Sequence, residues 1–322
     1  MLNRLLLITQ LHRSGGTLFS QLLDGHSAIQ AHPHELFIGK PKKWDWPDLQ
    51  AVLKSPNDLF DKLQEPKIAA IGRAGIFIKP GSNPDARKQT VPFTYDIDLH
   101  RQIFCDLYSG FPAKSQRLAI QLYLATFFRA WPEYKSSHHE RYVSCFLPHL
   151  IIHSRSVTAL LADFPDILLV SLIRRPDSWI SSLVNHLSLD LSNTQKIVQH
   201  LERWRLSVDM ILKLHSAEAL HTFTSTYEHL VCDTRAEMVR FASCAGIPFE
   251  PILLLPTVGG YPVLPNSSYS RTRGGVNQAS VEPSLTLPEA VSQMLYDNYT
   301  PVYQRAIAEL GLPPMPVRLS ES

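Results

Sequence analysis

A short polar loop near the start of the chain carries the residue types best suited to binding an anion. The loop reads His-Arg-Ser-Gly-Gly-Thr at positions 12–17, after an apolar run at 5–8 and before a helical pattern that continues to residue 24. A buried strand, a glycine loop and a helix N-terminus leave first-turn N–H groups without intrahelical partners, at the positive end of the helix dipole. The glycines let successive amides turn toward one ligand, while Arg13 adds a guanidinium and Ser14 and Thr17 add hydroxyls. The loop therefore predicts a phosphate or sulfate site.

The same loop argues against a typical nucleotide triphosphatase. That class needs a lysine directly after the last glycine of its phosphate loop to reach the terminal phosphates. Here Thr17 follows Gly16, and the cation Arg13 stands two residues before Gly15. An ordinary strand–turn–helix with incidental glycines remains the alternative for this loop taken alone.

A second candidate anion site follows an apolar run in the middle of the chain. Residues 167–173 are almost entirely apolar, which is typical of a parallel strand covered on both faces. Arg174 and Arg175 come directly after this run, and Pro176 stands where a helix could begin. Ligands of open α/β sheets bind at the carboxyl ends of the strands. Two such ends predict a ligand with two separated anionic groups.

These motifs make the chain resemble the sulfotransferases that use 3′-phosphoadenosine 5′-phosphosulfate (PAPS), in particular bacterial-type and protein-tyrosine-type members with an Arg-Ser-Gly loop. The first motif of that family is similar to residues 12–17, although His12 replaces a proline and Gly16 a hydroxyl residue. The second motif, an arginine at a strand end with a serine eight residues later, matches Arg174 and Ser182. The stretch 225–251 resembles the family's Tyr-Glu strand end, helix and Gly-Ile-Pro stop.

The resemblance implies a set of cofactor-binding residues. Two of them, Arg271 and Arg273, lie in a glycine- and serine-rich stretch near the C-terminus and could close over the 3′-phosphate, because arginine captures phosphate in a bidentate manner. A solvated loop without a ligand is the alternative for that stretch. The full implied set is Arg13, Ser14, Gly15, Gly16, Thr17, Arg174, Ser182, Arg271 and Arg273.

Sulfuryl transfer also needs a base for the acceptor's proton. The resemblance to Arg-type loops implies a glutamate just beyond the first helix, and Glu35 lies 22 residues after Arg13. His34 is the second candidate and His32 a further competitor, because histidine is suited to proton transfer near neutral pH. The expected catalytic residues are therefore Glu35, Arg13 and His34.

The composition describes an ordinary globular protein. The chain has 322 residues, 44% of them hydrophobic, and a net charge of +2, which gives no reason to expect nucleic acid or an anionic membrane as partner. No apolar stretch is long enough to span a membrane, and the first apolar run is short for a signal peptide. The four cysteines show no paired spacing. Together these features favour a cytoplasmic protein with reduced thiols.

We expect an α/β fold with a central parallel sheet and helices on both faces, similar to the P-loop sulfotransferase fold. Residues 1–322 should form a single domain, with residues 30–150 as a helical and loop-rich insertion that binds the acceptor. The spacing over 194–214 predicts a helix that buries Trp204. Tyr227 and Glu228 should hold a strand–helix corner, Thr234 and Glu237 a capping box, and residues 287–310 one or two closing helices broken at Pro301.

The expected reaction moves a sulfuryl group from PAPS to a hydroxyl, or less readily an amine, of a small-molecule, lipid or carbohydrate acceptor. We expect no metal, because no carboxylate follows a strand as a magnesium ligand would. Two alternatives remain: a nucleotide-dependent kinase with an atypical loop, and a non-catalytic relative that binds the nucleotide. The sequence names neither the acceptor nor the oligomeric state.

Overall fold

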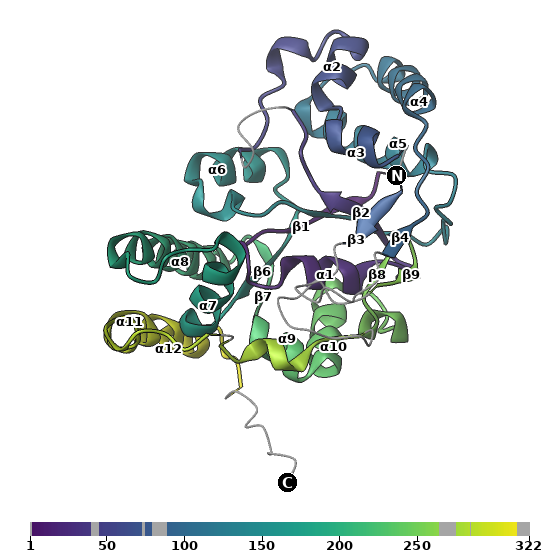
Figure 1. The fold of residues 1–322 in the computed structure, drawn as a ribbon. Coiled ribbons are helices and arrows are strands. Elements are labelled where there is room, and N and C mark those ends of the chain that lie inside the picture. Colours follow the sequence, from purple (N-terminus) through teal and green to yellow (C-terminus); the bar gives the residue numbers. More distant parts are fainter. Residues whose placement is uncertain are drawn as a thin grey trace.

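A computed structural model describes residues 2–39, 45–72, 75–78, 89–263, 275–283 and 285–313. Its centre is a five-stranded parallel sheet with the strand order β2-β5-β1-β6-β7 (Figure 1). Because all the strands are parallel, their carboxyl ends lie along one edge, and the chemistry-bearing loops follow that edge. The strands are β1 (Arg4–Ile8), β2 (Ile29–Glu35), β5 (Tyr142–Phe146), β6 (Leu168–Ile173) and β7 (His221–Thr226).

Both faces of the sheet are covered, which explains why its strands are so apolar. In β1, Leu5 and Leu7 pack into one core cluster, while Leu6 and Ile8 pack into the other. The second cluster lies under α1 (Gly16–Leu23) and α10 (Thr234–Ala245). The first lies under α5 (Gln116–Arg129), α6 (Ser154–Asp163), α7 (Pro176–Leu187) and α8 (Thr194–His215). The predicted α/β class with helices on both faces is confirmed.

The segment between β2 and β5 is mostly helical. It contains α2 (Pro56–Leu63), α3 (Pro66–Ile71), α4 (Ile97–Gly110) and the buried helix α5, with a small antiparallel pair, β3 (Ile76–Ile78) and β4 (Gln89–Val91). Figure 1 shows α2–α5 gathered together on one side of the sheet. A second small pair is formed by β8 (Thr257–Val258) and β9 (Tyr261–Pro262).

The C-terminal part holds α9 (Tyr227–Cys232), α11 (Glu289–Met294) and α12 (Thr300–Glu309). A π-helical turn, Leu295–Tyr299, joins the last two helices, and Pro301 lies in the first turn of α12. The expected break at Pro301 is therefore wrong by one turn, because proline is tolerated where a helix begins. The expected capping box is also wrong: Asp233 caps α10 by accepting from the Ala236 N–H, and the Thr234 hydroxyl donates back to the Leu230 carbonyl.

The helix predicted over 194–214 is confirmed as α8, and Trp204 is buried in the core. Its indole Nε1 donates to the carbonyl of Arg174 at 2.9 Å. The tryptophan therefore supports the end of β6, where the second candidate anion site begins.

Candidate active site

The loop between β1 and α1 has the backbone geometry of an anion site. Gly15 is the N-cap of α1 in a left-handed conformation, with φ 94°, and no side chain caps the helix there. The preceding Arg13 is also left-handed, with φ 65°, which is uncommon for a residue with a side chain. Such strained residues concentrate at functional sites. The first-turn amides of α1 can therefore face a ligand.

Both glycines are required by packing. A Cβ at Gly15 would collide with the ring of Tyr227, and one at Gly16 with the Gln10 amide and with the Phe146 ring, at 2.5 Å. The missing hydroxyl at position 16, a departure from the family motif, thus has a steric cause. The loop lies directly against the sheet, and its backbone takes the place that a side chain would fill.

Replacing Gly16 with alanine is expected to lower the free energy of unfolding by about 1–3 kcal/mol, the usual cost of overpacking a core. Urea denaturation checks this value. Gly110→Ala is the matched control, because no atom lies within 4 Å of its added Cβ; it should leave stability unchanged or raise it by up to about 1 kcal/mol. Equal effects of the two substitutions would contradict the packing argument.

The tertiary structure brings the two predicted anion sites together. The Arg13 Nε donates to the Ser182 hydroxyl on α7 at 3.0 Å. The Arg174 guanidinium, at the end of β6, donates to the Arg13 carbonyl at 2.9 Å. Burial, followed by the nearby Arg174 charge, lowers the pKa of Arg13. A buried and a partly buried cation side by side make an anion favourable at this point.

Three groups that the sequence did not reveal hold Arg174 in place. Its Nε donates to the Ser178 hydroxyl at 3.0 Å, and a terminal nitrogen donates to the Ser280 carbonyl at 2.7 Å. Its guanidinium carbon lies 4.4 Å from the centre of the Tyr227 ring. Ser178 could have been found as the residue one helical turn after Arg174. No local signal points to Ser280, which lies 106 positions away in sequence.

The Tyr227–Glu228 corner has the structural role that the sequence predicted. The Glu228 carboxylate is fully buried and accepts from the Arg175 N–H at 2.9 Å and from the Tyr303 hydroxyl at 3.0 Å. Burial raises the pKa of Glu228. The corner therefore joins the ends of β6 and β7 to α12, and Tyr227 also touches the glycine loop.

Glu35 and His34 lie at the carboxyl end of β2, on the same edge of the sheet as the glycine loop. Glu35 pairs with Phe146 of β5, which pairs with Ile8 of β1. Two strand spacings, roughly 10 Å, therefore separate the end of β2 from β1. Burial, together with the Lys67 and His32 charges, lowers the pKa of His34, so this imidazole is neutral near pH 7.

His32 takes a different position from the other two base candidates. It is 2% exposed, and its Nε2 lies 3.1 Å from the Glu65 carboxylate, which is equally buried. A residue enclosed in this way does not reach an acceptor at the surface of the site.

Several buried polar atoms surround the glycine loop without a hydrogen-bond partner among the described residues. They are the Thr9 hydroxyl, both polar atoms of the Gln10 amide and the His12 Nδ1. Burial and the nearby His186 and Arg13 charges lower the pKa of His12 to about 4, so its ring is neutral. Buried polar groups are ordinarily paired. Buried polar atoms without partners around one loop therefore indicate a site for a polar ligand.

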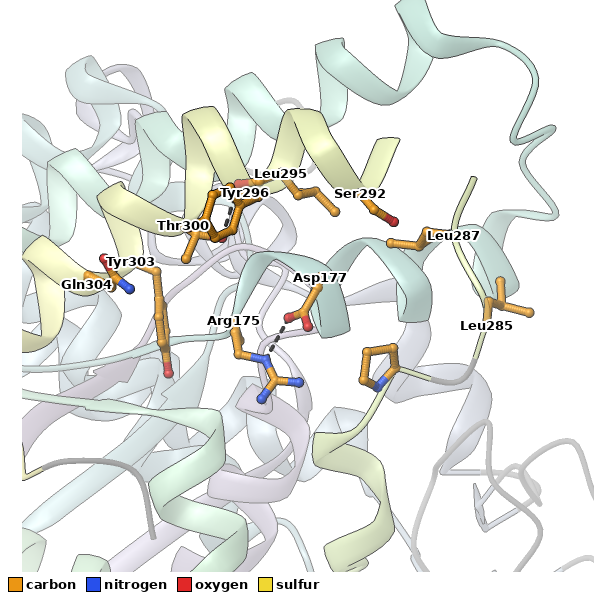
Figure 2. A pocket seen from close by; sticks show the side chains of 11 residues that line it. Arg175, Asp177, Leu285, Leu287, Ser292, Leu295, Tyr296, Thr300, Tyr303 and Gln304 are labelled. Atoms are coloured by element: carbon orange, nitrogen blue, oxygen red, sulfur yellow. Dashed lines mark hydrogen bonds and ion pairs between the residues drawn. The ribbon is translucent and has the colours of Figure 1, made fainter. Parts of the chain in front are cut away.

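A separate pocket of about 500 Å³ opens between the start of α7 and the closing helices (Figure 2). Arg175 and Asp177 form an ion pair of 2.7 Å on one side, while Leu285, Leu287 and Leu295 supply apolar surface. No residue of the glycine loop lines this pocket. Its volume and mixed lining can accept an amphipathic small molecule.

Two of the expected residues, Arg271 and Arg273, lie outside the residues that the structure describes. Among those it does describe, no helix is long and apolar enough to cross a membrane, and no group of three or more His, Cys, Asp or Glu side chains could hold a metal ion.

Comparison with known proteins agrees with this fold and site. Residues 6–251 match the sequence profile of the sulfotransferase family. This match covers most of the chain, so the chain belongs to the sulfotransferase family, and the protein is a sulfotransferase. A search of curated protein sequences finds no significant match.

Two solved structures share the fold. One is the sulfotransferase domain from the curacin biosynthetic pathway, 17% identical, with a TM-score of 0.53 over 97% of this chain and 99% of the other. The second is the sulfotransferase domain from the Synechococcus PCC 7002 olefin synthase, 18% identical, with a TM-score of 0.56 over 95% of this chain and 94% of the other. At identities this low, the structural similarity shows a common fold and nothing more specific.

Proposed function

We propose that this sulfotransferase moves a sulfuryl group from PAPS to a hydroxyl, or less readily an amine, of a small-molecule, lipid or carbohydrate acceptor. The observation that carries the proposal is the junction of the two anion sites. Ser182 accepts from Arg13, and Arg174 donates to the Arg13 backbone, although these residues are more than 160 positions apart. A donor with phosphate groups at both its 3′ and 5′ positions needs two adjacent cationic sites.

The residues present fit such a nucleotide. The uncapped start of α1, the two closely packed glycines and the unpaired polar atoms around the loop suit the 5′-phosphosulfate end. Arg174 and Ser182 suit the 3′-phosphate, and Arg271 and Arg273 are proposed to add to it. The nucleotide supplies an activated sulfuryl group, whose S–O bond to the 5′-phosphate breaks as a new S–O bond forms to the acceptor oxygen.

The protein's own groups would lower the barrier by electrostatics and proton transfer. Arg13 and the first-turn amides of α1 are placed to stabilise negative charge that grows on the leaving phosphate oxygen. Ser14, Gly15, Gly16 and Thr17 would hold this group in position. Glu35 takes the acceptor's proton, and His34 is the second candidate for that task.

The acceptor is proposed to bind in residues 30–150 of a single domain that spans residues 1–322. The strands β2 and β5 belong to the sheet, so the helical segment between them would form the binding surface. Glu35 is the last residue of β2, and the chain continues from it directly into this segment. An acceptor held by α2–α5 would therefore approach the sheet edge from the side on which the proposed base lies.

The proposed function is tested with the purified protein, the desulfated product nucleotide 3′-phosphoadenosine 5′-phosphate, and PAPS. We expect calorimetry to show binding of the product nucleotide, and sulfuryl transfer to an acceptor panel to continue in a strong chelator. Activity that requires magnesium and consumes ATP would instead indicate the kinase. Nucleotide binding without transfer to any acceptor would indicate the non-catalytic relative.

Arg174→Ala is expected to weaken binding of the product nucleotide by about 1.5–3 kcal/mol, the usual worth of a hydrogen bond to a charged group. Calorimetry with nucleotides that have and lack the 3′-phosphate checks the assignment. The loss should be confined to the 3′-phosphorylated nucleotide. A variant that discriminates between the two nucleotides as well as the wild type does would place the 3′-phosphate elsewhere.

A further inference from the structure

The end of β2 departs from regular strand pairing just before the proposed base. Ala31 pairs with Ser144 of β5, but the next pair joins Glu35 to Phe146. Four steps along β2 thus match two steps along β5, and residues 32–34 bulge out of the ladder. A strand that loses its ladder hydrogen bonds needs other contacts to hold a defined shape.

Glu65, the residue before α3, supplies these contacts from outside the sheet. Its Oε2 accepts from the Phe37 N–H at 2.7 Å, and its Oε1 lies 3.1 Å from the His32 Nε2. The carboxylate therefore binds the chain on both sides of Glu35. Glu65 is 2% exposed, so water offers no substitute for either contact.

The partners of His32 determine its protonation state. Its Nδ1 lies 2.9 Å from the His34 carbonyl, and its Nε2 faces the Glu65 carboxylate. Both neighbours are acceptor oxygens, which favours a proton on both ring nitrogens. Burial opposes the charge of His32, but the Glu65 carboxylate and the His34 carbonyl together raise the pKa of the ring.

Three titratable side chains that pack around the pair stay neutral. Burial and the Glu65 charge raise the pKa of the thiol of Cys145 on β5 and of the hydroxyls of Tyr123 on α5 and Tyr95 before α4. On β2 itself, the pKa of His34 is lowered by burial and by Lys67. A His32 imidazolium is thus the counter-charge of Glu65.

We propose that the His32–Glu65 ion pair positions the reaction's base, because it holds the bulged end of β2 and with it the Glu35 carboxylate. The inference rests on the role that the proposed function gives to Glu35. Glu65 opens α3, inside the segment proposed to bind the acceptor. The position of the base therefore depends, through this ion pair, on how the acceptor-binding segment packs against β2.

Glu65→Gln tests the proposal, since it keeps the shape and an acceptor oxygen for the Phe37 N–H but removes the charge. We expect kcat to fall by about 10–100-fold, in line with misplacement of a catalytic group by a fraction of an ångström to 1 Å. Product-nucleotide affinity by calorimetry, and the KM for PAPS, should remain within twofold. Glu309→Gln is the control outside this segment, because its exposed carboxylate pairs with Arg305 at 3.6 Å instead, and it should keep the wild-type kcat.

A double variant tests whether Glu65 acts through Glu35. The variant that combines Glu65→Gln with Glu35→Gln should be no slower than Glu35→Gln alone, because a base that is absent cannot be misplaced. Multiplied losses in the double variant would overturn the proposal. A wild-type kcat in Glu65→Gln, with transfer by the wild-type enzyme intact, would overturn it as well.

Nuclear magnetic resonance of ¹⁵N-histidine-labelled protein gives a readout independent of activity. The signals of His32 are assigned by their loss in His32→Gln. Both ring nitrogens should be protonated at pH 7 in the wild type, and only one in Glu65→Gln. A neutral ring in the wild type would refute the pair. Failure of this inference can be told apart from failure of the proposed function. If the proposed function is wrong, the wild-type protein itself lacks nucleotide binding or sulfuryl transfer.

Discussion

Replacing Glu35 with glutamine is expected to lower the turnover number by about 10²–10⁴-fold, the usual contribution of a general base. The amide keeps the shape of the side chain and loses only its ability to take a proton. A carboxylate near a phosphosulfate is electrostatically unfavourable for donor binding, so its place on this sheet edge points to a task toward the acceptor. Steady-state kinetics with saturating PAPS measures the loss, and calorimetry should show nearly unchanged product-nucleotide affinity.

His34→Gln is the matched comparison, because it changes the neighbouring residue at the same strand end. We expect a smaller loss of turnover from it than from Glu35→Gln. If the histidine variant loses turnover and the glutamate variant keeps it, the base is His34. If neither variant is slower, the base lies in the segment between β2 and β5.

Removal of the Arg13 side chain, in Arg13→Ala, is expected to lower turnover by about 10²–10³-fold, as the loss of one preorganised donor to a developing charge does. Affinity for the product nucleotide should fall less, by about tenfold. The difference arises because the guanidinium faces charge that grows only as the S–O bond breaks. Single-turnover kinetics and calorimetry on the same variant separate the two effects.

Arg205→Ala serves as the control for Arg13→Ala, since Arg205 forms an exposed ion pair with Glu202 within α8. Both turnover and affinity should be unchanged there. An Arg13→Ala variant with a normal turnover number and only a raised KM would make Arg13 a residue that binds the donor equally well in the ground state and the transition state.

Local sequence patterns predicted most of the elements on which the site stands. The apolar runs became β1 and β6, the glycines became the start of α1, and Pro176 begins α7. These features depend on backbone preferences and on side-chain periodicity within one segment, so neighbours in sequence are sufficient to determine them. The corner at Tyr227 was predicted from the resemblance to the family's Tyr-Glu strand end. The predicted N-cap of α10, Thr234, is one residue too late. Asp233 and Thr234 are adjacent and both residue types are good N-caps, and Asp233 is the one that caps the helix.

Tertiary packing alone decided which of these elements meet. The order β2-β5-β1-β6-β7 places Arg174 against the Arg13 carbonyl and places β2 two strands away from β1. It also brings Ser280 to Arg174 and Glu65 to His32. Such contacts form between segments that share no sequence pattern, because they are set by how two helical layers fill the space above and below one sheet. The sequence by itself thus determined the chemistry available at each strand end, while the three-dimensional packing decided that two arginines lie side by side and that a buried glutamate contacts the strand of the proposed base.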